Sequence, residues 1–368
     1  MRKILFCNIR EQWTIRGHKQ FDIKWVNLMA SLFDVTVLTP MASWYDDCQV
    51  CFKDSVKIEV CNFKEDLESV KVRQNWNKKF YPHIPYRTIK HDLYVIKEIE
   101  ELDKKYNYDY IVASTADIFA LFLSRKKTLF DKLYVIEHSC NAYTKRTWRL
   151  IYTLIKNKYS HIVMEQPGVD VLKADYMIPE QKICYIPHML NIVDSKCKSM
   201  FNYDIVGISN SNDEEEISKI IEYEKEHHFF ETNKIHAIFR SRNLVYESEY
   251  LKVFKGRMGL SYEDYNGILA NAKILILPFG VKFGVRSSGT IQDALSLKKP
   301  IIGSPFGTLN YYKKMFPHIC YTYSNIQELE RKILQILNDA SDYSNEFASF
   351  AEQHSDECIR NQMKKIFD

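Results

Sequence analysis

The sequence predicts an α/β protein with two doubly wound parallel sheets, and two observations support that prediction. Short apolar runs, rich in β-branched and aromatic residues, alternate with helix-length segments along the whole chain. The alternation starts again after a polar stretch at residues 191–202, which we interpret as a linker. Because strand–helix alternation produces parallel sheets covered on both faces, we expect two Rossmann-like domains facing across a cleft.

The first domain is expected at residues 1–190. Its strands are short runs bounded by polar residues, at 4–7, 35–38, 110–113, 133–136 and 161–164. An amphipathic segment at 21–32 predicts the first helix, after a polar loop that contains Gly17, His18 and Lys19. No G-x-G-x-x-G motif follows the first strand, so a nicotinamide-dependent dehydrogenase is disfavoured.

The second domain is expected at residues 191–350, with strands at 204–208, 235–239, 251–254, 274–277 and 300–303. The last residues, 351–368, predict a C-terminal helix that packs back toward the N-terminal domain. Ligands of such sheets bind beyond the carboxyl ends of the strands, so the functional site is expected at those ends.

Composition and the first residues favour a cytoplasmic protein, with the inner face of the cell membrane as a further possible location. The chain of 368 residues is 46% hydrophobic and 27% charged, which is typical of globular proteins. The first apolar run stops at Asn8, too early for a secretory signal, and no run approaches the about 18 apolar residues that a membrane span needs.

The nine cysteines are scattered and odd in number, which indicates free thiols rather than a disulfide framework. The pair Cys48-x-x-Cys51 has no second pair at zinc spacing. No metal site is expected.

Charge is distributed unevenly between the two expected domains. Residues 1–190 contain 29 of the 51 basic and 23 of the 47 acidic residues, so the first part is basic and the second slightly acidic. A basic first domain favours an anionic partner, either a phosphorylated acceptor or an anionic membrane surface. Nucleic acid is not expected, because no recognised nucleic-acid-binding module is present.

Residues 143–159 carry much of this positive charge. They mix Trp148, Leu150 and Leu154 with Arg149 and other cations. A helix of this composition could rest on an anionic bilayer and approach a lipid-linked acceptor. A core helix with a charged outer face is the alternative.

The segment from residue 265 to residue 304 is the most informative about chemistry. A strand at 274–277 leads through a glycine-containing loop to a predicted helix. Free N–H groups and the positive end of the helix dipole make such a helix start suitable for phosphate, and an arginine adds a fork suited to diphosphate oxygens. The candidate nucleotide-binding residues here are Arg286, Ser287, Ser288, Gly289, Thr290 and, one turn into the helix, Asp293.

Residues 293–304, with the letters DALSLKKPIIGS, resemble the donor-binding core of glycosyltransferases with the B-type double-Rossmann fold, GT-B, and especially family 4. The resemblance implies the GT-B fold, a nucleotide-diphosphate sugar donor, and a ribose-binding role for Asp293 in place of the family's second glutamate. Family 4 enzymes of bacterial surface polysaccharide synthesis are mostly retaining, so the resemblance also implies retention of configuration. More loosely, it extends over the whole chain.

Two features depart from the family pattern. The family's first glutamate would fall at Val285, and its basic pair is replaced by the letters SNSN at 209–212. Other cations must then neutralise the diphosphate charge. Arg286 is the leading candidate, and the further candidates are Arg240, Arg242, Lys255 and Arg257.

Three residues at strand ends of the first domain are candidate catalytic groups. His138 follows the strand at 133–136, and in similar enzymes a histidine near this point contacts the transferred sugar. Glu137 and Asp117 are the carboxylates best placed for a general base if the enzyme inverts configuration. Structural roles remain the alternative for all three.

The sequence therefore predicts a glycosyltransferase that moves a sugar from a UDP- or GDP-sugar to a glycan or polyprenyl-linked acceptor in cell-surface polysaccharide synthesis. The donor is a substrate, and no further cofactor is expected. Two alternatives remain open. One is a sugar-nucleotide epimerase of the same fold, and the other is a non-catalytic partner subunit, which the missing glutamate would explain.

Overall fold

The computed structural model describes residues 1–9, 16–40, 42–46, 48, 50–61, 86–124, 127–140, 146–190, 202–256 and 260–368. The chain divides into two compact units. Unit 1 comprises Met1–Ile186 with Ile359–Asp368, and unit 2 comprises Pro187–Cys358. The chain thus passes from unit 1 to unit 2 after Ile186 and returns after Cys358. The expected linker lies outside the described residues, except for Asn202.

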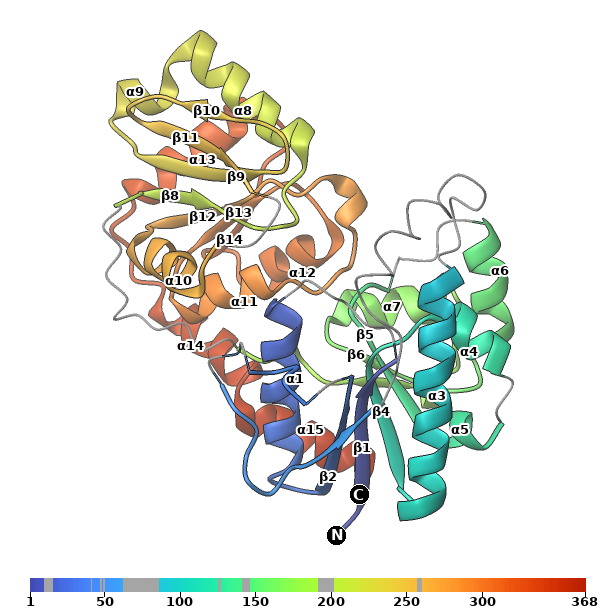
Figure 1. Ribbon diagram of the computed structural model, residues 1–368. Coiled ribbons are helices and arrows are strands. Elements are labelled where there is room, and N and C mark those ends of the chain that lie inside the picture. The colour runs from blue at the N-terminus through green and yellow to red at the C-terminus, as the bar shows by residue number, and fades with distance from the viewer. Residues whose placement is uncertain are drawn as a thin grey trace. The chain divides into compact units, whose positions relative to one another are not determined.

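In its described part, unit 1 contains a seven-stranded sheet whose paired strands are all parallel (Figure 1). The strand order is β3-β2-β1-β4-β5-β6-β7. The strands are β1 (Lys3–Asn8), β2 (Asp34–Thr39), β3 (Lys57–Val60), β4 (Tyr110–Thr115), β5 (Leu133–Glu137), β6 (Ser160–Val163) and β7 (Ile183–Tyr185). The order reverses between β1 and β4, as it does in a doubly wound sheet.

The central strands of this sheet are buried on both faces. In β1, Ile4, Leu5, Phe6 and Cys7 have no exposed surface, which explains why the strand is a continuous apolar run in the sequence. The helices of unit 1 are α1 (Arg16–Met29), α3 (Tyr86–Tyr106), α4 (Ile118–Ser124), α5 (Lys127–Lys132), α6 (Arg146–Ile155) and α7 (Gln166–Ala174), with a 3₁₀ turn at Glu180–Lys182.

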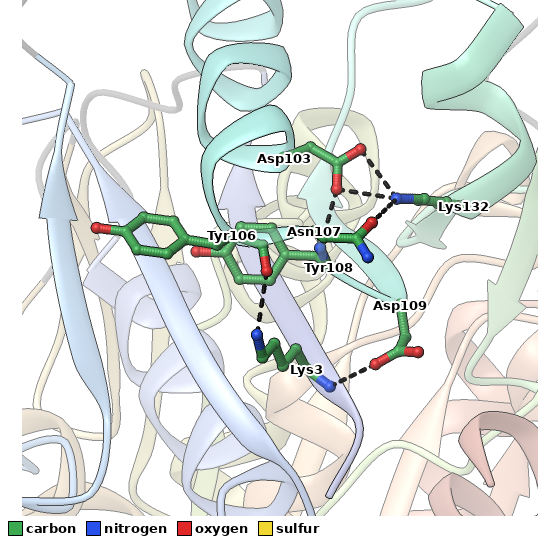
Figure 2. A network of polar contacts seen from close by, with 7 residues as sticks. All are labelled: Lys3, Asp103, Tyr106, Asn107, Tyr108, Asp109 and Lys132. Carbon is green, nitrogen blue, oxygen red and sulfur yellow. Dashed lines mark hydrogen bonds and ion pairs between the residues drawn. The ribbon is translucent and has the colours of Figure 1, made fainter.

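A polar network fixes the turn between α3 and β4 (Figure 2). Asn107 ends the helix in the left-handed conformation, with φ of 49°. The Asp103 carboxylate accepts hydrogen bonds from Lys132 Nζ at 3.0 Å and from the backbone N–H of Tyr108 at 3.0 Å. The backbone N–H of Lys3 donates to Asp109 at 2.8 Å. The network therefore ties the starts of β1 and β4 to the end of α5.

The last helix, α15 (Asp356–Phe367), joins unit 1 from Ile359 onward. Its Phe367 is fully buried, and its ring lies 5.2 Å from that of Tyr110 and 5.1 Å from that of Tyr134. These two tyrosines stand near the starts of β4 and β5. The C-terminal residues of the chain are thus part of the core of unit 1.

Unit 2 contains a second seven-stranded sheet within its described residues. Its order is β10-β11-β9-β8-β12-β13-β14, with β10 antiparallel to β11 and the other pairs parallel. The strands are β8 (Ile205–Gly207), β9 (Ala237–Ser241), β10 (Tyr246–Glu247), β11 (Leu251–Lys255), β12 (Ile274–Leu277), β13 (Ile301–Gly303) and β14 (Cys320–Thr322). The order reverses between β8 and β12, so this sheet is also doubly wound.

Helices cover both faces of the second sheet (Figure 1). In β12, Ile274 and Ile276 pack with α8 (Glu214–His227), α9 (Phe229–Asn233) and α13 (Ile326–Leu337). Leu275 and Leu277 pack on the other side with α10 (Tyr262–Asn271), α11 (Gly289–Ser296), α12 (Gly307–Met315) and α14 (Ser344–Gln353). Alternate side chains of one strand therefore enter two separate cores. Within the described residues, no helix is both long and apolar enough to cross a membrane.

Candidate functional site

Two loops meet where the strand order of the second sheet reverses. The loop after β8 is folded back by Asn212, whose Nδ2 donates to the carbonyl of Gly207 at 2.7 Å and to that of Arg240 at 2.8 Å. The backbone N–H of Asp213 then donates to the carbonyl of Pro278, in the loop after β12, at 2.8 Å. Ligands of doubly wound sheets bind at such reversal points, so these loops define the candidate nucleotide site.

The loop after β12 carries Arg286 and is anchored on α12. Gly284 has a φ of 62°, which a side chain would strain, and its carbonyl accepts from the N–H of Thr308 at 3.3 Å. The Thr308 hydroxyl donates to the carbonyl of Arg286 at 3.0 Å. The guanidinium of Arg286 is exposed and lies 5.8 Å from the ring centre of Phe283. The backbone is thus fixed while the cation faces solvent.

Helix α11 begins directly after this loop. Ser288 is the N-cap residue, but its hydroxyl makes no capping bond; its carbonyl accepts from the N–H of Ile291 at 3.1 Å. The hydroxyl of Thr290 donates to the Ser209 hydroxyl, in the loop after β8, at 3.2 Å. The positive end of α11, which begins at Gly289, therefore lies at the reversal point of the sheet.

Asp293 is buried inside α11, and its Oδ2 accepts a hydrogen bond from the phenol of Tyr265 at 2.7 Å. Tyr265 belongs to α10, so the carboxylate is held between two helices. We assigned no role to Tyr265 from the sequence. It is 28 residues from Asp293, and no local pattern links the two positions.

The structure places two of the other candidate cations, Arg240 and Lys255, on neighbouring strands, and Arg242 is exposed just beyond β9. Arg240 is buried near the end of β9, and its Nε and Nη2 donate to the carbonyl of Gly256 at 3.2 and 2.9 Å. Burial lowers the pKa of Arg240. Lys255 is exposed at the end of β11. Both stand at carboxyl ends of strands, whereas Arg257 lies outside the described residues.

In unit 1, His138 lies just beyond β5. Its Nε2 is 3.0 Å from the carbonyl of Ser114, and because a carbonyl can only accept, Nε2 carries the proton. The ring lies 4.7 Å from that of His18 and 5.1 Å from that of Phe21. The structure therefore brings the candidate His138 together with His18, which lies 120 residues earlier in the sequence.

The two candidate bases in unit 1 have structural partners. The buried Glu137 carboxylate is 2.8 Å from Nδ1 of buried His161, whose Nε2 lies 2.7 Å from the carbonyl of Lys156. Nε2 must donate to that carbonyl, so a single proton is shared between Nδ1 and Glu137. Asp117 is buried and accepts from the N–H groups of Phe119 and Ala120 at 2.8 and 3.1 Å. These are the contacts of a helix N-cap at α4.

The main polar group of this region, Asp22, was missed from the sequence. Its carboxylate is buried and accepts from Asn8 Nδ2 at 2.7 Å, from the Tyr45 hydroxyl at 3.2 Å and from the Ser114 hydroxyl. Burial raises the pKa of Asp22 to about 6, although the three hydrogen bonds act in the opposite direction and lower it. The sequence offered no clear signal, because the segment 21–32 is amphipathic and also contains Lys24 and Asn27.

Asp22 lines a pocket at the carboxyl ends of β1, β2 and β4. His18, one helical turn before Asp22 on α1, lines it too, and burial lowers the pKa of this histidine. Trp44 also lines the pocket, with the Lys19 ammonium 4.3 Å from its ring centre. The pocket is lined by a carboxyl group, an imidazole and an aromatic face, and its volume is about 20 Å³, which is room for about one water molecule.

Within the described residues, no group of three or more His, Cys, Asp and Glu side chains is arranged to hold a metal ion. The described candidate residues thus fall into two sets. Unit 2 holds the cations, the helix start and buried Asp293, and unit 1 holds His138 with the buried carboxylates Glu137 and Asp117.

No family model and no curated protein sequence matches the chain. Several solved structures are similar to it. A glycosyltransferase from Rickettsia africae has a TM-score of 0.59 and 15% identity, over 100% of this chain and 94% of that one. Anabaena Alr3699/HepE, in complex with UDP and glucose, has a TM-score of 0.59 and 13% identity, over 99% of each chain. The UDP-N-acetylglucosamine 2-epimerase of Rickettsia bellii has a TM-score of 0.56 and 11% identity, over 100% and 96%. With its two doubly wound sheets, the chain has the GT-B fold that the sequence predicted.

Proposed function

We propose that the protein is a glycosyltransferase of the family 4 type, which transfers a sugar from a UDP- or GDP-sugar to a glycan or polyprenyl-linked glycan. The observation that carries this proposal is the start of α11, tied through Thr290 to Ser209 at the reversal point of the second sheet. The solved glycosyltransferases of the same fold support the choice of sugar transfer. We assign the reaction to cell-surface polysaccharide synthesis, by analogy with the family it resembles.

The donor nucleotide is assigned to unit 2. In this proposal, the diphosphate binds the start of α11, from Ser287 in the preceding loop to Thr290 in the first turn, where backbone N–H groups and the helix dipole favour anions. Arg286 supplies a permanent charge on an anchored loop, and Arg240 and Lys255 add positive potential from β9 and β11. Asp293, oriented by Tyr265, accepts hydrogen bonds from the ribose hydroxyls.

The acceptor is assigned to unit 1, over the side chains that line the mouth of the small pocket at the carboxyl ends of β1, β2 and β4. Trp44 offers an aromatic face, and Asn8 and Asp22 offer groups that exchange hydrogen bonds with sugar hydroxyls. His138 is the group that we expect to contact the transferred sugar. Glu137 and Asp117 remain candidate bases, but their contacts with His161 and with the start of α4 support structural roles.

We propose that the reaction retains configuration. In that mechanism, the bond between the anomeric carbon and the diphosphate oxygen breaks, and the acceptor oxygen bonds to the anomeric carbon on the same face. A phosphate oxygen of the leaving diphosphate takes the proton of the acceptor hydroxyl. The helix start and Arg286 stabilise the negative charge that develops on the diphosphate, so these residues can perform the role that a metal ion has elsewhere. No dedicated carboxylate pair is needed.

The nucleotide site is tested by thermal shift with UDP, GDP, CDP and dTDP. One of them should stabilise the protein, and Arg286→Ala should weaken its binding about tenfold to a hundredfold, because charge-assisted hydrogen bonds contribute about 1.5–3 kcal/mol. Arg331→Ala, an exposed arginine on α13, is the matched control. Equal stabilisation of the wild-type protein and the Arg286 variant would contradict the assigned phosphate site.

A sugar-nucleotide epimerase is the second candidate, because the solved structures of the same fold include UDP-N-acetylglucosamine 2-epimerases. Incubation with a UDP-sugar alone, followed by NMR, separates the two activities. An epimer that forms without acceptor favours the epimerase, whereas transfer to an added glycan favours the transferase. Nucleotide binding with neither product favours a non-catalytic partner subunit.

A further inference from the structure

Unit 2 holds a cavity at the edge of its sheet opposite the proposed nucleotide site, and we call it the edge cavity. Its volume is about 290 Å³, which is room for a small organic molecule. Among the residues that line it, Ile274 begins β12, Pro300 precedes β13 and Ile319 precedes β14, so the cavity lies at the amino ends of three neighbouring parallel strands. The candidate nucleotide residues follow the carboxyl end of β12. The two places are therefore separated by the length of that strand, about 13 Å for its four residues.

The lining of the edge cavity is mostly apolar and aromatic. Ile319, Tyr321 and Phe347 line it and are buried. Tyr343 and His318 also line it, and their rings stack with centres 5.3 Å apart and an angle of 5° between the planes. The Tyr321 hydroxyl donates to the carbonyl of His318 at 2.7 Å. These contacts hold the rings in place around the cavity.

Asp339 gives the edge cavity a negative charge. It lies in the connection between α13 and α14 and lines the cavity. Its carboxylate accepts hydrogen bonds from the backbone N–H of Ser341 at 2.9 Å and from the phenol of Tyr343. Hydrogen bonds from Ser341 and Tyr343 lower the pKa of Asp339 to about 2, so the carboxylate is charged at neutral pH.

The basic groups that line the edge cavity are paired with other carboxylates. The Nζ of Lys273 lies 2.9 Å from Asp204, and Nδ1 of His318 is paired with Glu346. In the part of the chain that the structure describes, Asp339 has no cation at ion-pair distance. A positively charged ligand would therefore complement the charge of the cavity.

Aromatic rings beside a carboxylate suit an organic cation, because the face of a ring attracts positive charge. An ammonium group already lies near one of these rings, since the Nζ of Lys332 is 5.6 Å from the ring centre of Tyr321. We propose that the edge cavity binds a small organic amine, whose ammonium group pairs with Asp339 and whose apolar body lies against Tyr321, Tyr343 and Phe347. The inference does not depend on sugar transfer, because no nucleotide or glycan takes part in this contact.

Three probes with the same phenyl ring separate charge from shape: phenethylamine, phenethyl alcohol and hydrocinnamate. Ile274, Ile319 and Ile336 line the cavity, so NMR of the full chain labelled at its isoleucine methyl groups reports on it directly. Phenethylamine should shift these three signals with a Kd of about 1 mM, as expected for a ligand of this size. The alcohol should bind about fivefold more weakly and hydrocinnamate more weakly still. The signal of Ile4, in β1 of unit 1, should not move.

Matched variants keep this test specific. Asp339→Asn should bind phenethylamine only as well as phenethyl alcohol, with the affinity for the alcohol unchanged. Asp342→Asn, which replaces an exposed carboxylate in the same connection, should bind all three probes as the wild type does. Ser341→Phe should fill the cavity and weaken every probe at least about tenfold, whereas Ser349→Phe, at an exposed position on α14, should not.

These variants should keep the nucleotide-induced thermal shift of the wild type, so a failed amine site is distinguishable from a failed nucleotide site. Three results would overturn the proposal. The signals of Ile274, Ile319 and Ile336 could stay in place at a phenethylamine concentration about tenfold above the expected Kd. Hydrocinnamate could bind as tightly as the amine, or Asp339→Asn could leave the affinity for the amine unchanged. The third result is a shift of Ile4 as large as those of the cavity residues, which would show non-specific binding.

Discussion

The Thr290 hydroxyl donates a hydrogen bond to the Ser209 hydroxyl at 3.2 Å, across 81 residues of sequence. Ser209 follows β8 and Thr290 lies in the first turn of α11, so this contact joins the two sides of the reversal point in the second sheet. A diphosphate bound at the helix start would lie beside both hydroxyls. The pair therefore links the fold of unit 2 to the proposed donor site.

Thr290→Val should weaken the binding of the best nucleoside diphosphate about fivefold. The substitution keeps the shape of the side chain but removes one hydroxyl, and a neutral hydrogen bond contributes about 1 kcal/mol. Isothermal titration calorimetry measures the change. Thr153→Val, which removes an exposed hydroxyl that donates to the Arg149 carbonyl within α6, is the control. Identical affinities for the wild type and the Thr290 variant would remove this residue from the site.

Asp293→Ala separates a ribose contact from a phosphate contact. If Asp293 binds the ribose, the variant should bind the nucleoside diphosphate about tenfold more weakly and inorganic pyrophosphate as well as the wild type does. Arg286→Ala should weaken both ligands. Competition between pyrophosphate and nucleotide gives both affinities in one titration.

Tyr265→Phe is the companion variant for Asp293. It removes the phenol that donates to Asp293 at 2.7 Å but leaves the carboxylate in place. We expect a loss of nucleotide affinity smaller than that of Asp293→Ala. An Asp293 variant that loses pyrophosphate and nucleotide equally would contradict the ribose assignment.

The sequence predicted the central strands well and the edges poorly. The expected strands at 4–7, 133–136 and 274–277 are observed because both faces of these strands are buried, which makes them continuous apolar runs. All four edge strands, β3, β7, β10 and β14, were missed. The strands β3 and β10 are four and two residues long and contain Lys57, Glu59 and Glu247, so they carry little hydrophobic signal. The strands β7 and β14 are apolar but only three residues long.

The site was predictable only where its residues are consecutive. The segment at 286–293 could be identified because loop, helix start and carboxylate follow one another in the sequence. Asp22 could not be predicted as the centre of a network, since Ser114 is 92 residues away. The partner of Glu137 could not be predicted either, because its bond to His161 depends on the pairing of β5 with β6.

Glu137→Ala and Asp117→Ala distinguish structural from catalytic carboxylates. Removing Glu137 leaves His161 without its partner in the core, which should lower the free energy of unfolding by about 3–5 kcal/mol. Asp117→Ala should lower it by about 1 kcal/mol through loss of the N-cap. All five tryptophans lie in unit 1, so tryptophan fluorescence in urea follows this unit. A variant that loses activity with unchanged stability would support a catalytic role instead.

Asp22 should make unit 1 less stable as pH rises from about 4 to about 6. Its pKa is raised to about 6, so in this range the folded state keeps a proton that the unfolded state has released. The shift of about two pH units corresponds to about 2–3 kcal/mol of unfolding free energy. Asp22→Asn should remove that decrease, measured by tryptophan fluorescence in urea. The exposed Asp46→Asn should keep it, and parallel curves for wild type and Asp22→Asn would contradict the assignment.

His354 should give unit 2 the opposite pH dependence. Its Nδ1 donates to the carbonyl of His188 at 2.6 Å, and its ring stacks on Phe350 at 4.2 Å. The contact joins the first residues of unit 2 to the end of α14, shortly before the chain returns to unit 1. Burial lowers the pKa of His354 to about 4, so between about 6.5 and 4 only the unfolded state binds this proton.

The unfolding free energy of unit 2 should therefore fall by about 3 kcal/mol as pH drops from about 6.5 to about 4. His354→Gln keeps an N–H donor but cannot titrate, so unit 2 of this variant should lose less stability in acid. Hydrogen exchange of amides in β8 and β12, which belong to unit 2, measures the change separately from unit 1. His227→Gln, an exposed histidine on α8, should keep the wild-type acid sensitivity. If the wild type and His354→Gln lose equal stability in acid, the wild-type His354 ring takes up its proton in the folded state as readily as in the unfolded state. The hydrogen bond to the His188 carbonyl would then have to tolerate a buried charge.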